Sequence, residues 1–170
     1  MKEFIFCILI TFFLFSCSSV DDPLSQEQYI SITLTYKDSV ETLKIVDKSF
    51  SPVDGAKYFD TSTAKYTSIM LSDRTDNEPY FLSVIFPGDT IGNYDWTIPY
   101  NSILIQKSKE ERIPILININ GQTNVTTYGS IGERVEGNFN GVVRNFSSAD
   151  IININGDFSV QRVDDYNSDL

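Results

Sequence analysis

Apolar and polar residues alternate with a period of two along most of this chain. In "YISITLTYK" (29–37), isoleucine, leucine and the second tyrosine share one parity, and serine and threonine occupy the other. Such alternation is typical of a β-strand with one buried and one solvated face. Segments of this kind, separated by Pro, Gly, Asn, Asp and Ser, predict about ten strands, at 29–37, 41–46, 66–72, 80–86, 92–98, 102–106, 114–120, 123–130, 133–143 and 150–162.

The fold class follows from the absence of a second periodicity. After the N-terminal segment, no stretch of helical length repeats its apolar residues every 3.6 positions, and the longest irregular region, 51–65, is expected to hold at most a helical turn. The pattern predicts an all-β fold, a single antiparallel β-sandwich or flattened barrel over residues 28–163. Lys107–Glu111 is expected to form a charged hairpin turn. The polar, acidic end at 164–170 is expected to be disordered.

A repeated motif tests the strand assignment. The stretch "ININGQ" (117–122) recurs as "ININGD" (152–157). A two-residue turn at Asn155-Gly156 would turn Phe158 away from Ile152, although the two share one parity. We therefore expect the second copy to run straight through Gly156, in a long hairpin with 135–143. In the first copy, a continuous strand and a three-residue loop fit the parity equally well.

The N-terminus has the features of an export signal. Lys2 precedes an apolar run that is shorter than the ~18–20 residues a membrane-spanning helix needs. The run ends in "LFSC", which resembles the lipobox of bacterial lipoproteins, and this resemblance implies lipidation of Cys17 after removal of residues 1–16. The alternative is an ordinary signal peptide. Residues 17–27 would form a flexible tether, and "SSVDD" resembles the export tag of Bacteroidetes surface lipoproteins, or is a plain acidic linker.

The amino-acid composition limits the catalytic and metal-binding chemistry that the chain can support. The chain contains no His, and its two Cys are Cys7, which leaves with the signal, and Cys17. Triads that use His, thiolate chemistry, His-ligated zinc and a disulfide in the mature domain are therefore not expected. We expect no cofactor. The net charge of −10 disfavours a nucleic-acid partner.

Three segments together resemble a known group of proteins. They are "GNYDW" (92–96), "GERVEGNFNGVV" (132–143) and "ININGDFSV" (152–160). In this order they resemble a family of small uncharacterised Bacteroidetes lipoproteins. The shared positions are Gly92, Tyr94, Gly137, Phe139, Gly141, Asn155, Gly156, Phe158 and Val160. The resemblance implies an all-β fold and an envelope location, without an activity.

Two weak candidate sites remain. Tyr94, Trp96 and Tyr100 would form a stacking platform for a sugar ring if they are exposed, whereas the period-two placement favours burial in the core. Asp73, Asp76 and Glu78 in "DRTDNE" offer hard oxygen ligands for calcium, but their spacing does not fit an EF-hand and a solvated turn is favoured.

The function expected from the sequence is a non-catalytic binding or structural module of the cell envelope. The protein would be an outer membrane lipoprotein on the cell surface or the periplasmic face, held in the membrane by its N-terminal lipid. A glycan or an envelope protein would be its partner. The alternatives are a surface glycan-binding accessory lipoprotein and a hydrolase that uses paired carboxylates.

Overall fold

The fold is described from a computed structural model, which covers residues 27–47, 54–73, 80–99, 101–106, 116–145 and 148–167. These residues form strands and turns, and the predicted all-β class is confirmed. No helix in these ranges is both long enough and apolar enough to cross a membrane. The predicted signal segment 1–16, Cys17 and the tether up to residue 26 lie outside the described residues.

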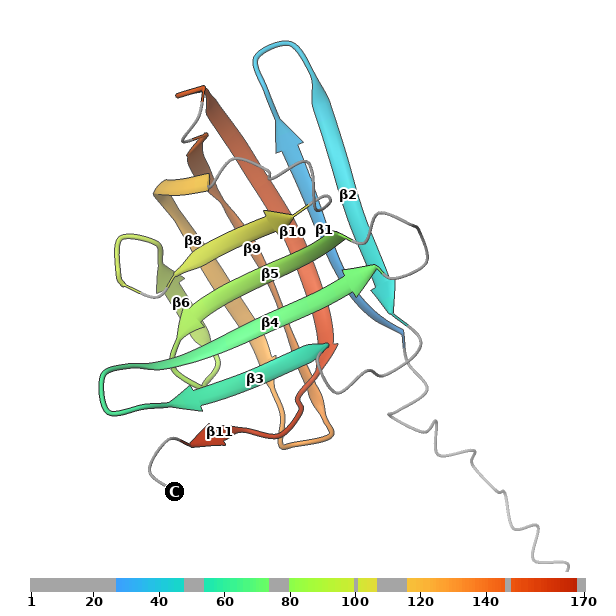
Figure 1. Ribbon diagram of the computed structural model, residues 1–170, viewed down its shortest axis with the longest axis vertical. Helices are drawn as coiled ribbons and strands as arrows, with labels where there is room; N and C mark the ends of the chain where they lie inside the picture. The colour runs from blue at the N-terminus through green and yellow to red at the C-terminus, as the bar shows by residue number, and fades with distance from the viewer. Residues whose placement is uncertain are drawn as a thin grey trace, which may run out of the picture.

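The strands form two sheets (Figure 1). The large sheet has the order β2-β1-β10-β9-β8-β6 and is antiparallel throughout. Its strands are β1 Gln28–Thr35, β2 Val40–Asp47, β6 Gly92–Asp95, β8 Leu116–Tyr128, β9 Arg134–Asn145 and β10 Ile151–Gln161. The small sheet has the order β11-β3-β4-β5-β7. Its strands are β3 Gly55–Asp60, β4 Lys65–Asp73, β5 Tyr80–Pro87, β7 Ser102–Gln106 and β11 Tyr166–Asn167.

The two sheets pack face to face as a sandwich. In Figure 1 the small sheet lies in front of the large one, and its strands cross those of the large sheet at a steep angle. The core between them takes one parity from each strand: Ile30 and Ile32 of β1 and Leu82 and Val84 of β5 are completely buried. The period-two pattern of 29–37 therefore identified the buried face of β1 correctly.

Glycines of the large sheet lie beneath aromatic rings of neighbouring strands. Gly156 pairs with Phe139, and Gly137 pairs with Phe158, across the β9–β10 ladder. A Cβ atom on Gly156 would lie closer than 3.0 Å to both the Phe139 ring and the carbonyl oxygen of Ser31. β10 runs without interruption through Gly156, so the expected continuous strand is confirmed. Glycine at this position leaves the space that the Phe139 ring occupies.

The first copy of the motif also runs through its glycine. β8 continues past Gly121, which has a φ of 145°, and the ladder to β9 shifts register between Asn118 and Asn120. The shift is a β-bulge, which places an additional residue, Ile119, in one strand. Of the two alternatives for this copy, the structure contains the continuous strand.

Three other predictions were wrong. The region 51–65 was expected to be irregular, but its described part contains β3, which pairs with β4. The turn at 107–111 was expected to close a hairpin, but β7 pairs with β5 and β8 lies in the other sheet. Residues 107–111 themselves lie outside the described ranges. The end of the chain was expected to be disordered from 164, but Tyr166 and Asn167 pair in parallel with β3.

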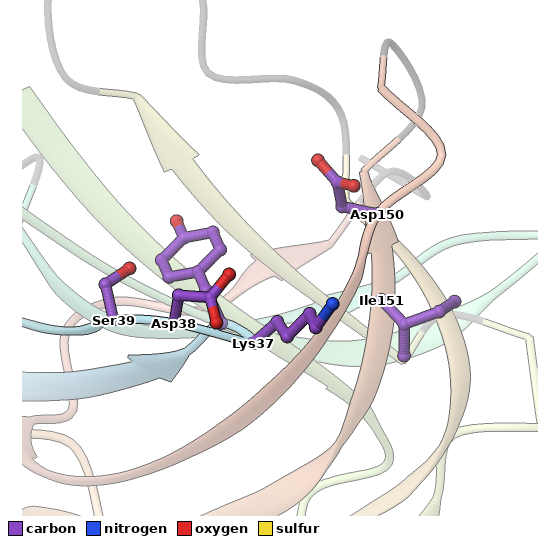
Figure 2. A pocket seen from close by; sticks show the side chains of 6 residues that line it. Lys37, Asp38, Ser39, Asp150 and Ile151 are labelled. Atoms are coloured by element: carbon purple, nitrogen blue, oxygen red, sulfur yellow. The ribbon is translucent and has the colours of Figure 1, made fainter.

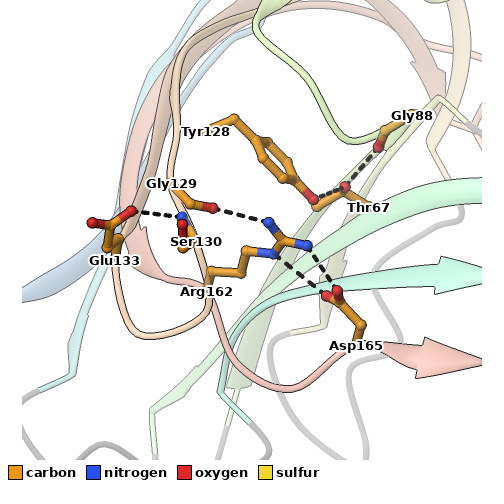
Figure 3. Close-up of polar contacts among 8 residues, drawn as sticks. All are labelled: Thr67, Gly88, Tyr128, Gly129, Ser130, Glu133, Arg162 and Asp165. Carbon is orange, nitrogen blue, oxygen red and sulfur yellow. Dashed lines mark hydrogen bonds and ion pairs between the residues drawn. The ribbon is translucent and has the colours of Figure 1, made fainter.

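An arginine joins the end of the chain to both sheets (Figure 3). Arg162 donates to the carbonyl oxygen of Gly129 at 3.0 Å and to Oδ2 of Asp165 at 2.7 Å, and its guanidinium lies 4.9 Å from the centre of the Tyr128 ring. The Tyr128 hydroxyl lies 2.8 Å from Oγ1 of Thr67, which donates to the carbonyl oxygen of Gly88 at 2.7 Å. These contacts connect β8 in the large sheet with β4 in the small one. Burial raises the pKa of Tyr128, so this hydroxyl remains a neutral hydrogen-bonding group.

Candidate functional site

Trp96 belongs to the core and not to an exposed platform. It follows β6 in a turn, is 5% exposed, and donates from Nε1 to Oγ1 of Thr123 at 3.0 Å. Its ring covers Gly121 and Gly141, where a Cβ atom would overlap it. The alternative of a sugar-stacking platform is therefore wrong for Trp96.

The turn that carries Trp96 is fixed by backbone and side-chain hydrogen bonds. The Trp96 amide donates to the carbonyl oxygen of Gly121 at 2.9 Å, and Oδ1 of Asp95 accepts from the Thr97 amide at 2.8 Å. The hydrogen bonds from Thr97 lower the pKa of Asp95. Tyr94 is half-buried and donates its hydroxyl to the carbonyl oxygen of Thr90 at 2.6 Å. Tyr100 lies outside the described residues.

Of the three acidic candidates for calcium, the structure describes only Asp73. Asp73 ends β4, and Asp76 and Glu78 fall in the gap at 74–79, outside the described residues. Within the described ranges, no three His, Cys, Asp or Glu residues are grouped so that they could hold a metal ion. The described geometry therefore adds no support to a metal site.

A pocket of about 510 Å³ lies where the β1–β2 turn meets the start of β10 (Figure 2). The turn is closed by the Tyr36 amide, which donates to the carbonyl oxygen of Ser39 at 2.8 Å. On the opposite side, Asp150 accepts a hydrogen bond from the Ser148 hydroxyl at 2.5 Å. The lining is mixed in chemistry and consists of Tyr36, Lys37, Asp38, Ser39, Asp150 and Ile151.

Two carboxylates line this pocket, but their setting is unsuited to acid catalysis. Asp38 and Asp150 are both exposed, and Lys37 lies in the same lining. Catalytic carboxylic acids are usually held in a dry, apolar environment that keeps one of them protonated. The pocket is better suited to weak polar contacts at the rim of a larger surface.

The larger surface is the outer face of the large sheet, which points away from the small sheet. The register aligns its side chains in rows across the strands, about 4.8 Å apart from strand to strand. One row is Thr42, Thr33, Asn155, Asn140, Gln122 and Asp95, and the next is Lys44, Ser31, Asp157, Asn138, Asn124 and Asn93. The amides of these rows, with two neighbours on β8 and β10, are called the amide face here: Asn93, Asn120, Gln122, Asn124, Asn138, Asn140, Asn153 and Asn155.

The amide face is open to solvent, and its side chains are not bonded to one another. Its members are exposed except Asn124, which is half-buried, and in the described part of the chain none of their side chains bonds to another residue. Each amide therefore presents an NH₂ donor and a carbonyl acceptor outward.

The adjoining row of the same face, toward the start of β1, differs from the amide face because its polar side chains are hydrogen-bonded to one another. There Glu136 accepts hydrogen bonds from Ser159 at 2.8 Å and from Thr127 at 3.1 Å. Burial raises the pKa of Tyr29, and its hydrogen bond to Asp157 adds to this increase. Polar side chains at this end of the face are thus paired with one another, whereas the amide side chains of the amide face are not.

The amide face was not predicted from the sequence, although it leaves a signal there. Asparagine is depleted in strands, more strongly than Lys or Glu, whereas Thr is enriched there. Here asparagine repeats at alternate positions, as in "ININ" and "GNFNG". The apolar positions of these segments predict the core, and the asparagines at the polar positions carry the signal for the amide face.

Comparisons with known proteins add no relative. The chain matches no protein-family model, no curated protein and no solved structure.

Proposed function

We propose that this protein is a lipid-anchored, non-catalytic binding module of the bacterial cell envelope, with the amide face as its binding surface. The observation that carries the proposal is the amide face itself. Strand-disfavoured residues occupy outward positions that the core does not need, and they are not paired with one another. Departures from local propensity of this kind tend to occur at functional sites.

The anchor would leave this surface accessible. Gln28 begins β1, and the residues from Cys17 to Glu27 reach at most ~40 Å when extended. The β1–β2 turn and the pocket lie at the opposite end of β1, roughly 26 Å away along the strand. A lipidated Cys17 would thus hold the domain by the end of the sheet that carries the paired polar residues.

Replacing Cys17 with alanine is expected to release the protein from the membrane. Stable anchoring needs more than one acyl chain, and lipidation at this thiol would supply them. The measurement is the distribution of the full-length protein between membrane and soluble fractions after cell lysis. Cys7→Ala, within the signal, is the control and should leave the protein in the membrane. Continued membrane retention of the Cys17→Ala protein would contradict the anchor.

A photo-cross-linking residue at position 140 is expected to capture an envelope component in intact cells. Asn140 lies at the centre of the amide face, on β9. The matched control is the same residue at position 62, an exposed site in the β3–β4 turn. A light-dependent adduct at 140 and none at 62 is the expected result. Equal adducts at both positions, or none at 140, would refute the amide face as the binding surface.

A further inference from the structure

We infer that the amide face binds a neutral, polyhydroxylated chain, that is, an uncharged polysaccharide laid across the strands of the large sheet. This inference rests on the proposed binding function and names the ligand class of the same surface. It differs from the sugar platform considered above, because the contacts are hydrogen bonds from amides and not stacking on aromatic rings.

The donors and acceptors of the amide face match those of a sugar. A sugar hydroxyl donates one hydrogen bond and accepts others, and an amide side chain also offers both functions. The central strands β8, β9 and β10 contribute Gln122, Asn140 and Asn155 side by side in one row. Thr33 and Thr42 extend that row, with their hydroxyl oxygens 3.2 Å apart. A carboxylate can only accept a hydrogen bond and an ammonium group can only donate one. Either would therefore satisfy only one of the two hydrogen-bonding functions of a sugar hydroxyl.

The amide face is uncharged although the protein as a whole is acidic. The protein has a net charge of −10, yet the amide face is built from uncharged side chains. The charged residues of the two rows are Lys44 and Asp95, on the outermost strands β2 and β6, and Asp157 on β10, which is hydrogen-bonded to Tyr29. The overall negative charge of the protein would repel a polyanion, and the few acidic side chains on this face would attract a polycation only weakly. A neutral chain is not repelled.

The shape and extent of the two rows suit a linear chain. Six strands at about 4.8 Å spacing make each row about 24 Å long, and adjacent rows lie about 7 Å apart. This is a long, narrow strip that several linked sugar units can follow. Neither of the two rows carries an apolar side chain, whereas protein interfaces have aromatic or aliphatic anchors at their centre. The half-buried Val142, between Asn120 and Asn153, lies in the adjoining row.

The test is affinity electrophoresis of the full-length protein in non-ionic detergent. Native gels contain dextran, amylopectin or galactomannan as neutral probes, and dextran sulfate as the charged counterpart of dextran. We expect retarded migration in at least one neutral gel and none in dextran sulfate. The Asn138→Ala/Asn140→Ala double variant should bind about tenfold more weakly, through the loss of two hydrogen-bonding side chains. Ser62→Ala should bind as the unmodified protein does, and circular dichroism verifies that the variants are folded.

The outcomes separate this inference from the proposed function. Absence of retardation in every neutral gel overturns the inference, as does retardation that the double variant leaves unchanged or stronger binding to dextran sulfate. If the residue at position 140 still cross-links to an envelope protein, the proposed binding function survives while the polysaccharide does not. If position 140 captures nothing either, both fail together.

Discussion

Replacing Gly156 with valine is expected to lower the free energy of unfolding by about 3 kcal/mol or more, the upper range for overpacking a core. Any Cβ at this position would overlap the Phe139 ring on one side and the backbone carbonyl of Ser31 on the other. The ring cannot tilt away freely, because Phe139 is 1% exposed and enclosed by the core. The carbonyl belongs to β1, so moving it would disturb the β1–β10 ladder.

Urea titration followed by the fluorescence of Trp96, the single tryptophan, measures this change. Gly92→Ala is the matched control: it also lies in the large sheet, but its Cβ would meet nothing closer than the Tyr94 ring at 3.8 Å. The control should change the stability by no more than ~0.5 kcal/mol. A Gly156→Val protein with the unfolding midpoint of the parent would refute the account of glycine beneath aromatic rings.

The strands that could be predicted were those in which parity alone decides burial. In β10, Ile152, Ile154, Phe158 and Val160 all face the core, and their shared parity in the sequence is already incompatible with a tight turn at Gly156. Trp96 was expected in the core because it alternates with Tyr94 and Ile98, and it is buried. Ile98, which lies beyond the end of β6, is 47% exposed, so the predicted strand 92–98 is shorter than expected. Period two is a local property, and it is sufficient to show which side of a strand is buried.

Which strands pair with one another could not be predicted in the same way. The charged segment after β7 suggested a hairpin with β8, but β7 pairs with β5 and the chain then changes sheets. Nothing in the alternation of residues distinguishes these two outcomes, because both bury the same face of each strand. The pairing of β11 with β3 was missed because its segment is polar, although Tyr166 lies 5.5 Å from the Phe59 ring, centre to centre.

The amide face could be predicted from the sequence only in part. The asparagines of "ININ" and "GNFNG" other than Asn118 could have been assigned to the outer face from parity alone. Parity would misplace Asn118, which pairs with the buried Val143 before the bulge and has a buried Oδ1 atom. Their alignment into rows depends on the register of β8, β9 and β10, including the bulge near Asn118, which parity cannot supply. A site made of one residue type repeated across strands is therefore visible in sequence only as an unusual composition.

Replacing Trp96 with alanine is expected to destabilise the domain by about 3–5 kcal/mol, the usual cost of removing a buried large aromatic side chain. The ring covers Gly121 and Gly141, which have no side chains of their own to fill the space it would leave. The substitution also removes the donor to Thr123, whose side chain is completely buried. Thermal unfolding followed by far-ultraviolet circular dichroism measures the effect, since this variant lacks the fluorescent residue.

Two further substitutions separate packing from hydrogen bonding at this position. Trp96→Phe retains most of the ring over the glycines but loses the Nε1 donor, and should cost about 1–2 kcal/mol. Ile98→Ala lies in the same turn but is 47% exposed, so it should cost less than ~1 kcal/mol. If Trp96→Ala is no more destabilising than Ile98→Ala, the ring does not hold the large sheet against the core. If Trp96→Phe costs as much as Trp96→Ala, the hydrogen bond to Thr123 outweighs the packing over Gly121 and Gly141.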